Sequence, residues 1–344
     1  MTAGAGARKP VVIREDVPHA DRELIAEFIA QSPHGESTRV RYATQLGEFA
    51  AWLAHERTKR RERSGGLTSV VRADVVRFKA YLASGNRYAA SPTVRDRTRV
   101  LGASAVKNHV CAVQGLFKYL VVVEIVDRNP AEGVDRPRVK VRPGLLLSRE
   151  EVRAFLDARG RPREDVAAYV LAFTAVRLDS LRVMRWCDVD LDAGTVAIKA
   201  KRDKHLVLDL HPELRAELRR YRLHMLELAD RKVEIRAALA NPETAYLLLT
   251  RNGRPFTKRS LYAMVKRRAT RAGLYVEEPK HGECRSRVSP HVLRRTFATL
   301  QLNDGQPLDA VADVLGHESV DTTRKHYAFS SNERRRATIM SYSI

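Results

Sequence analysis

Hydrophobic residues recur at helical spacing through the first third of the chain. In TRVRYATQLGEFAAWLAHE, the residues Tyr42, Leu46, Phe49 and Leu53 fall at i, i+4, i+7 and i+11, which is one face of an α-helix. The runs VRADVVRFKAYLAS and SAVKNHVCAVQGLFKYLVVV carry stripes of the same kind, formed by Val75, Phe78, Leu82, Val106, Val110, Val113, Leu116 and Leu120. Because this patterning begins near residue 21 and no strand-like run interrupts it, residues 21–128 predict an all-α domain.

The segments on either side of this domain lack hydrophobic period. Residues 1–20 are rich in glycine, alanine and charge, and we expect them to be flexible. Residues 129–146 are rich in proline and basic residues, which is typical of an interdomain linker. A second domain, residues 147–327, then begins with Ser148 and Glu151, whose spacing predicts a capping box and a helix start.

The second domain has a mixed pattern. A helical run, VAAYVLAFTAV, is followed by the β-prone runs TVAIKA and HLVLDL, which are joined by the basic turn KRDK. This arrangement predicts a β-hairpin with Lys201 and Lys204 at its tip. Residues 212–239 read as one long charged helical region, and YLLLTRNGRPF reads as strand-like before another helix.

The charge balance predicts a binding partner. Lys and Arg number 62 against 41 Asp and Glu, a formal net charge of +21, so we expect a nucleic acid partner rather than a membrane surface or a place among small basic ribosomal proteins. Between residues 251 and 271 the chain has basic residues and no acidic one, which favours a phosphate-facing helix over a merely solvated face. The residues predicted to contact DNA are Lys204, Arg251, Arg254, Lys258, Arg259, Lys266 and Arg267.

The cysteines and the N-terminus exclude other classes. Cys111, Cys187 and Cys284 are isolated, so they indicate neither a metal site nor a disulfide framework, and they favour a reducing compartment. The N-terminus lacks the apolar core of a signal peptide, and no run is long enough to span a membrane. We therefore expect a cytoplasmic protein.

Candidate chemistry gathers between residues 289 and 327. Ser289 and Pro290 predict a helix start, and His291 and Arg294 lie in its first turn, where free backbone N–H groups favour an anion. The alternative for this pair is an ordinary helix start with a solvated arginine.

A second apolar helix in this region is stopped by Gly316, and it holds His317 just past its end, where the alternative role is a structural cap. A last short helix ends in Tyr327. The hypothesis is that these side chains converge and that Tyr327 is a nucleophile aimed at a DNA phosphate.

These motifs resemble a known family. HVLRRTFAT followed by LGHESVDTTRKHY is similar to the C-terminal signature of the tyrosine recombinase, or phage integrase, family. The segment TAVRLDSL matches the family segment that holds its first catalytic arginine, here Arg177, and AKRDK matches the family hairpin lysine, here Lys201. The resemblance runs from about Glu23 to the C-terminus. It departs from the family at a glycine before the arginine, where this chain has Ala175-Val176, and at an acid three residues after it, where this chain has Ser180 beside Asp179.

The resemblance implies a fold and a chemistry. The fold is mainly α, with a SAM-like helical core-binding domain and a mixed α+β catalytic domain of the DNA breaking-rejoining type, which has a small antiparallel sheet; together they form a C-shaped clamp. Arg177 and Arg294 hold the phosphate oxygens, Tyr327 attacks to give a 3′-phosphotyrosyl intermediate, and Lys201 protonates the 5′ leaving oxygen. His291 and His317 position groups and take part in proton transfer. Because the covalent intermediate stores the bond energy, no metal, ATP or other cofactor is expected.

The resemblance also implies partners. They are double-stranded DNA and further copies of the chain, as a monomer or dimer on a half-site and a tetramer in synapsis. Residues 328–344 are expected to pack on a neighbouring subunit, and no arm-binding domain is expected before residue 20. The implied role is integration, excision or transposition of a mobile element. The alternatives are a catalytically silent DNA-binding relative and a type IB topoisomerase-like activity.

Overall fold

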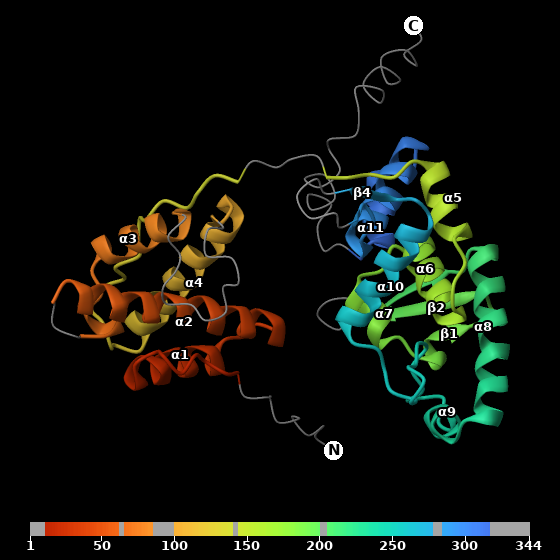
Figure 1. Cartoon of the computed structure of the whole chain (residues 1–344), viewed down its shortest axis with the longest axis horizontal. Helices are drawn as coiled ribbons and strands as arrows, with labels where there is room; N and C mark the ends of the chain where they lie inside the picture. Colours follow the sequence, from red (N-terminus) through yellow and green to blue (C-terminus); the bar gives the residue numbers. More distant parts are fainter. Residues whose placement is uncertain are drawn as a thin grey trace, which may run out of the picture. The chain divides into compact units, whose positions relative to one another are not determined.

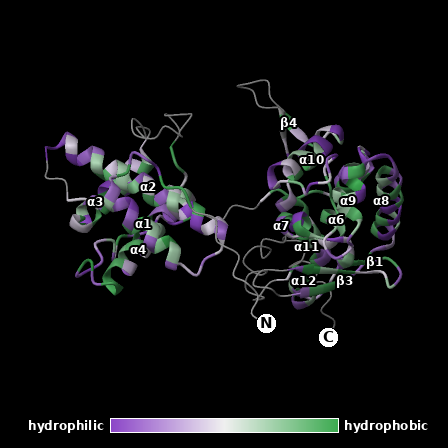
Figure 2. Cartoon of the chain, turned by 90° about the horizontal axis from the view of Figure 1, so that it is seen from below, coloured by the Kyte–Doolittle hydropathy of each residue, from purple (hydrophilic) through white to green (hydrophobic). Residues whose placement is uncertain are grey.

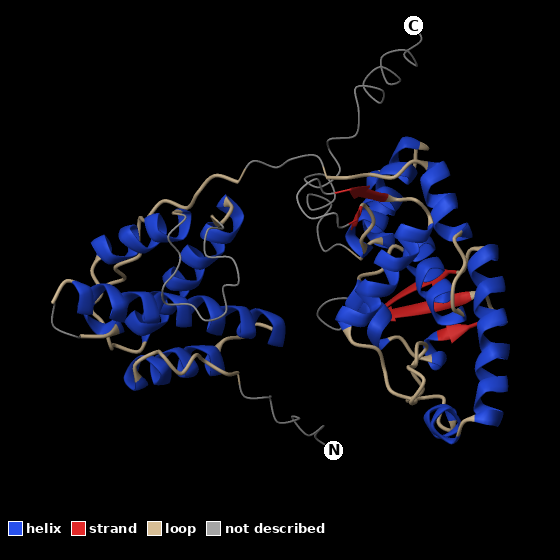
Figure 3. Cartoon of the chain, viewed as in Figure 1, coloured by secondary structure: helices blue, strands red, loops and turns tan. Residues whose placement is uncertain are grey.

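The structure is a computed structural model, and it describes residues 11–61, 65–84, 100–139, 144–199, 205–277 and 284–316. The chain divides into two units, residues 1–141 and 142–344, and each is considered by itself. Four predicted site residues, Lys201, Lys204, His317 and Tyr327, lie outside the described residues, as does the predicted tail, 328–344. Figure 1 gives the order of the elements, and Figure 3 shows strands only in the second unit among the described residues.

The first unit is built from the predicted apolar stripes. Its elements are α1 (His19–Gln31), α2 (Glu36–Lys59), the 3₁₀ turn η1 (Leu67–Ser69), α3 (Arg72–Ala83) and α4 (Ala103–Val122). Every residue of the three predicted stripes is buried except Tyr42, which is half-buried. The centre is aromatic, because the ring of Phe49 packs against the rings of Phe78 and Phe117. The all-α prediction is confirmed for the described part of this unit.

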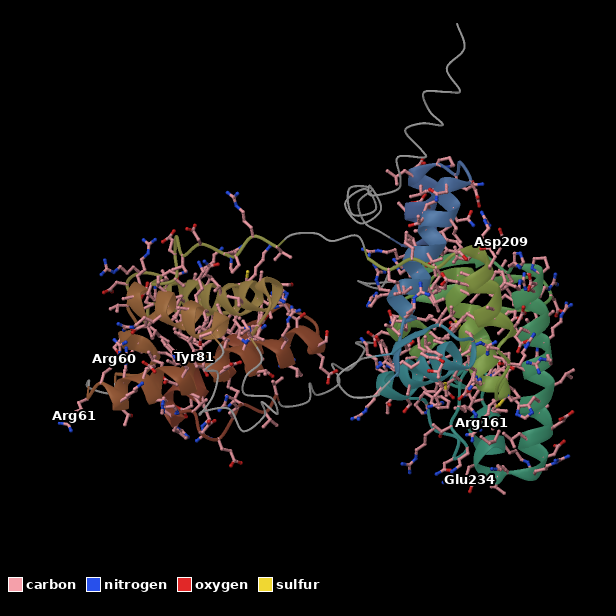
Figure 4. The ribbon with its side chains drawn as sticks, turned by 45° about the horizontal axis from the view of Figure 1, so that its top comes forward. Arg60, Arg61, Tyr81, Arg161, Asp209 and Glu234 are labelled. Carbon is pink, nitrogen blue, oxygen red and sulfur yellow. The ribbon has the colours of Figure 1, made fainter. Side chains whose placement is uncertain are left out.

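Polar contacts join α1 and α2 to the 3₁₀ turn η1 and the loop before it. Asp21 of α1 accepts a hydrogen bond of 2.7 Å from the backbone N–H of Leu67, and burial raises the pKa of its carboxyl group. Arg57 of α2 donates to the backbone oxygens of Gly66 and Ser69. α2 ends at Lys59, and it is followed by Arg60, its C-cap, and Arg61 (Figure 4), whose backbone is left-handed (φ 57°).

The start of the predicted linker is packed rather than extended. Ala131 and Val134 are buried in the core of the first unit. Gln114 of α4 donates to the backbone oxygens of both residues, at 3.1 and 3.2 Å, and Asn129 donates back to the carbonyl of Gln114. The first unit therefore extends past residue 128, because these hydrogen bonds satisfy a turn that has no hydrophobic period of its own.

The second unit is mixed, as predicted. Its elements, in chain order, are α5 (Arg149–Asp157), α6 (Pro162–Thr174), α7 (Leu178–Val183), η2 (Trp186–Asp188), β1 (Val189–Asp190), β2 (Thr195–Lys199), β3 (His205–Asp209), α8 (Pro212–Arg231), α9 (Val233–Leu239), α10 (Lys258–Arg271), β4 (Tyr275–Glu277), β5 (Cys284–Ser286), α11 (Pro290–Asn303) and α12 (Leu308–Val314). The predicted capping box at α5 is confirmed: Ser148 and Glu151 each accept a hydrogen bond from the other's backbone N–H.

Two small antiparallel sheets belong to this unit. β2 and β3 form the predicted hairpin, with Val196 opposite Leu208, and β1 adds a third strand. β1 and the second sheet, β4 with β5, were not predicted. The strand-like start predicted for the run that begins at Tyr246 forms only isolated bridges, Arg185 with Tyr246 and Leu249 with Pro255. The long helical region predicted over residues 212–239 is confirmed; it consists of two helices, separated at residue 232.

Hydrophobic and hydrophilic residues are interspersed along the helices of both units (Figure 2), and α6 is buried on every side over residues 164–171. Val196 and Ile198 of β2 join α6 and α8 in the main core of the second unit. A separate small cluster, formed by Ala175, Ala298, Leu302, Val311 and Leu315, packs α11 and α12 against the end of α6. No described helix is long and apolar enough to cross a membrane.

A buried ion pair ties the helices of the second unit together. Arg268 of α10 is 1% exposed and pairs with Asp165 of α6. Its guanidinium also donates to the carbonyls of Phe155 and Leu156 at the end of α5. Asp165 accepts a further hydrogen bond from Arg220 of α8. One arginine thus joins α5, α6 and α10, and its carboxylate partner reaches α8.

Asp165→Ala is expected to lower the free energy of unfolding of the second unit by about 3–5 kcal/mol, because it leaves the buried charge of Arg268 uncompensated. The double variant Asp165→Leu/Arg268→Met should recover most of that loss. Urea unfolding, followed by Trp186 fluorescence in a Trp52→Phe background, isolates this unit, since the chain has two tryptophans, one in each unit. Asp230→Asn, at an exposed position of α8, is the control and should change the value by less than about 0.5 kcal/mol.

Candidate active site

Arg294 lies at the centre of the predicted site and is buried, with 7% of its surface exposed. Its two terminal nitrogens donate to the backbone oxygens of Ala175, at 2.7 Å, and Leu315, at 2.6 Å. Ala175 caps the C-terminus of α6, and Leu315 caps the C-terminus of α12. The alternative of a solvated arginine is therefore wrong for Arg294, which joins two helix ends through their last carbonyls.

The helix that carries Arg294 begins as the sequence predicts. Ser289 is the N-cap of α11, its hydroxyl accepts a 3.2 Å hydrogen bond from the N–H of Val292, and Pro290 is the first helical residue. Gly316 follows the C-cap of α12; its φ of 60° is left-handed, and its N–H donates to the backbone oxygen of Asp313. The predicted glycine cap is confirmed.

Arg177 follows the same α6 end that Arg294 holds. Ala175 has a left-handed backbone (φ 50°), and two residues later Arg177 caps the start of α7. The glycine of the resembling family segment falls at this left-handed position, where glycine is unstrained and alanine is not. Arg177 is half-buried, and its side chain has no hydrogen-bond or ion-pair partner among the described residues.

His291 lies within electrostatic reach of both arginines. Although His291 is exposed, partial desolvation of its imidazole by neighbouring groups is the largest cause of its lowered pKa, and the charges of Arg294, Lys258 and Arg177 lower the pKa further, in that order. Asp179 raises it, by a smaller amount. The described site thus gathers one histidine and three cations from α7, α10 and α11. Lys258, at the start of α10, is a predicted DNA contact, and its effect on the pKa of His291 was not predicted.

The two residues that depart from the family pattern have separate contacts. The Ser180 hydroxyl donates to the backbone oxygen of Lys199 at 3.0 Å, which joins α7 to the end of β2. Asp179 pairs with Lys258 at 2.5 Å and lies 3.8 Å from Arg182. Neither residue contacts the guanidinium of Arg177.

The basic run on α10 serves two purposes. Arg267 and Arg271 pair with Glu164, and Arg268 is the buried partner of Asp165, so this half of the helix binds α6. Lys266 lies over the ring of Tyr262. Arg268 is therefore not available to a phosphate, whereas the exposed Lys266 and Arg267 remain predicted DNA contacts. Three of the residues predicted to contact DNA are exposed and have no side-chain partner among the described residues: Arg251, Arg254 and Arg259.

Comparison with known proteins identifies the family. The model of the phage integrase family matches residues 146–334, more than half of the chain. The chain belongs to this family. Among the described residues, no group of three or more His, Cys, Asp or Glu could hold a metal ion.

Curated relatives of this integrase-family chain are tyrosine recombinases. The tyrosine recombinase XerC of Roseiflexus castenholzii is 27% identical over 295 residues, which cover 81% of this chain and 87% of that protein. The tyrosine recombinase XerD of Chlorobaculum tepidum is 24% identical over 297 residues, which cover 84% of each.

Solved structures share the fold. XerH site-specific recombinase bound to a palindromic difH substrate has a TM-score of 0.65 at 18% identity and covers 94% of this chain and 90% of its own. The Tn1549 transposon integrase with circular intermediate DNA has a TM-score of 0.63 at 16% identity and covers 93% and 99%. The predicted fold, mainly helical with a small antiparallel sheet, is confirmed.

Ala175→Gly is expected to change the free energy of unfolding of the second unit by less than about 1 kcal/mol, because relief of the left-handed strain offsets the lost methyl packing and the added chain entropy. Ala175→Val should destabilise it by about 2 kcal/mol or more, because a β-branched residue is strained at positive φ and overfills the small cluster. Urea unfolding of the two variants measures the contrast. Equal losses would contradict a backbone constraint at this position.

The imidazole of His291 is expected to titrate below its usual value of about 6.5 in the free protein. Lys258→Met should raise this pKa relative to the wild-type chain, because it removes one of the three cations. Proton NMR, assigned with His291→Gln, measures both pKa values. The pKa of His291 is lower in the folded than in the unfolded chain. Protonation of the unfolded chain therefore lowers the free energy of unfolding as pH falls through the unfolded pKa, and His291→Gln should lose less stability than the wild type over this pH range.

Proposed function

We propose that the chain is a site-specific tyrosine recombinase that cleaves and rejoins DNA strands through a 3′-phosphotyrosyl intermediate at Tyr327. The observation that carries this proposal is the pair of hydrogen bonds from Arg294 to Ala175 and Leu315. They tie the segment that leads into Arg177 to the segment that leads through Gly316 to His317. The order of these residues along the chain matches the family signature, and the family match covers all of them.

The two arginines suit a phosphodiester under attack. Negative charge grows on the nonbridging oxygens as the phosphorus becomes pentacoordinate, and guanidinium groups donate to such oxygens and keep their charge. Arg294 is fixed by two carbonyls, and the side chain of Arg177 has no partner among the described residues. We infer that Arg177 takes its partner from the DNA and that Arg294 supplies a preorganised charge beside it.

Proton transfer is assigned to the remaining residues. A free tyrosine has a pKa of about 10, so the hydroxyl of Tyr327 must lose its proton as it attacks. His291, whose pKa is lowered, is neutral at neutral pH and is therefore able to accept a proton. In this proposal His291 and His317 position the reacting groups and move protons, and Lys201 protonates the 5′ leaving oxygen. The 3′-phosphotyrosyl bond conserves the energy of the broken bond, so the proposed reaction uses neither metal nor ATP.

The proposed partners are double-stranded DNA and further copies of the chain. A lambda integrase with the same fold has been solved as a dimer bound to a core site and as a tetramer bound to a Holliday junction, at TM-scores of 0.61 and identities of 14% and 15%. By analogy we propose a monomer or dimer on a half-site and a tetramer in synapsis, with residues 328–344 on a neighbouring subunit. Arg251, Arg254 and Arg259, which are exposed and have no side-chain partner in the described part of the chain, are proposed DNA contacts. The proposed role is integration, excision or transposition of a mobile element.

A covalent adduct tests the proposal against a catalytically silent DNA-binding relative. The wild-type chain, incubated with a nicked suicide duplex that carries a site selected from random DNA by binding, is expected to form an adduct that survives denaturation. Tyr327→Phe should remove the adduct and retain binding, because it removes only the nucleophilic oxygen. Denaturing gel electrophoresis with labelled DNA measures both.

Tyr342→Phe separates the two tyrosines near the C-terminus. It should still form the adduct, and an adduct that persists in Tyr327→Phe but is lost in Tyr342→Phe would move the nucleophile to Tyr342. Binding without any adduct by the wild-type chain would favour the silent relative. Relaxation of supercoiled plasmid without exchange between two duplexes would favour a topoisomerase-like activity.

A further inference from the structure

Lys258 has an unusual place for an exposed lysine. It is the first residue of α10, and its amino group lies 2.5 Å from a carboxylate oxygen of Asp179, two residues after Arg177. Helices α7 and α10 pack against each other, so the pair spans the two elements that bring Arg177 and the basic run together. The side chains of Lys258 and Asp179 are 63% and 58% exposed.

The amino group of Lys258 belongs to the electrostatic surroundings of the proposed site. Its charge acts on His291 together with the charges of Arg294 and Arg177. The charge of Asp179 acts on His291 in the opposite direction. A phosphate that reaches Arg177 and His291 therefore enters the field of Lys258 as well.

The pair with Asp179 is weak enough to yield to a phosphate. Ion pairs between exposed side chains contribute little to stability, because water and salt screen both charges. A phosphodiester oxygen is a strong acceptor, and Lys has three rotatable N–H donors on a flexible stem. The amino group can thus turn from Asp179 to a phosphate oxygen or bridge the two.

Asp179 does not contact the side chain of Arg177. The structure gives Asp179 contacts with Lys258 and Arg182, and none with Arg177. It therefore does not compete with DNA for the first arginine. Its position, one residue before the one at which the family resemblance leads one to expect an acid, aims it at the lysine of α10.

We propose that Lys258 is a further phosphate-binding residue at the reacting phosphodiester, and that Asp179 is the positioning residue that holds its amino group beside Arg177 and His291. This inference rests on the proposed recombinase function. Lys258 donates hydrogen bonds to a phosphate oxygen and keeps its proton throughout, so the proton transfers assigned to the other residues are unchanged.

The experiment compares rates of adduct formation on the suicide duplex described above, at protein concentrations that saturate binding. Lys258→Met is expected to slow the first-order rate about tenfold or more. It removes a positive charge whose interaction with the phosphate oxygens strengthens as the transition state forms. Lys258→Arg should restore most of the rate. Asp179→Asn should slow the reaction about threefold in the wild-type background, and should have no further effect in the Lys258→Met background.

Two control variants match the test variants in the charge that they remove and in the exposure of the position. Arg231→Met and Asp230→Asn, both at exposed positions near the end of α8, remove one charge of each sign from an element that contributes no residue to the site. Both should react at the wild-type rate. Circular dichroism of every variant checks that the fold is retained.

Each of the other possible outcomes contradicts one part of the proposal. A Lys258→Met variant that binds more weakly but reacts at the wild-type rate when saturated would make Lys258 an affinity contact only. An Asp179→Asn effect of equal size in both backgrounds would make Asp179 structural rather than positioning. A wild-type chain that forms no adduct would overturn the proposed function and this inference together, whereas a normal wild-type rate with an unaffected Lys258→Met overturns this inference alone.

Discussion

The guanidinium of Arg294 is the contact on which the arrangement of the site depends. The ends of α6 and α12 present backbone carbonyls that have no partner within their own helices, and each helix end carries partial negative charge. A buried cation with donors in a rigid fork satisfies both ends at once. In turn, the carbonyls stabilise a charge that would be costly to bury alone. Because α6 leads directly into Arg177, the position of the first arginine is set by the second.

Much of this arrangement follows from local sequence. The apolar stripes, the capping box at Ser148 and the N-cap at Ser289 are local patterns, and the structure has them where the spacing predicts. The contacts of Arg294 are different. They join residues 119 and 21 positions apart, and their acceptors are backbone carbonyls, which no residue type marks. Convergence on Arg294 could be expected from the family resemblance, but the means of holding it could not be read from the residues.

The basic run of α10 shows that a count of charges does not distinguish exposed from buried basic residues, whereas helical spacing does. Counting charges treats Arg259 and Arg268 alike. Spacing separates them, because Arg268 continues the stripe of Leu261, Met264 and Val265 at i, i+3, i+4 and i+7. An arginine on an apolar stripe needs a buried acid, and α6 supplies Asp165 in its first turn. The helical period therefore indicates which basic residues hold the fold and which remain for a polyanion.

The same geometry explains what replaces the expected acid after Arg177. Successive residues of a helix point about 100° apart, so a carboxylate moved by one position faces a different neighbour. On α7, Asp179 faces Lys258 of α10, and Ser180 donates instead to the backbone at the end of β2. In place of the expected acid, Asp179 and Ser180 thus make two separate contacts. Arg177 has no carboxylate partner among the described residues. With three cations around His291 and one acid turned toward Lys258, the described part of the site has an excess of positive charge that a phosphodiester can neutralise.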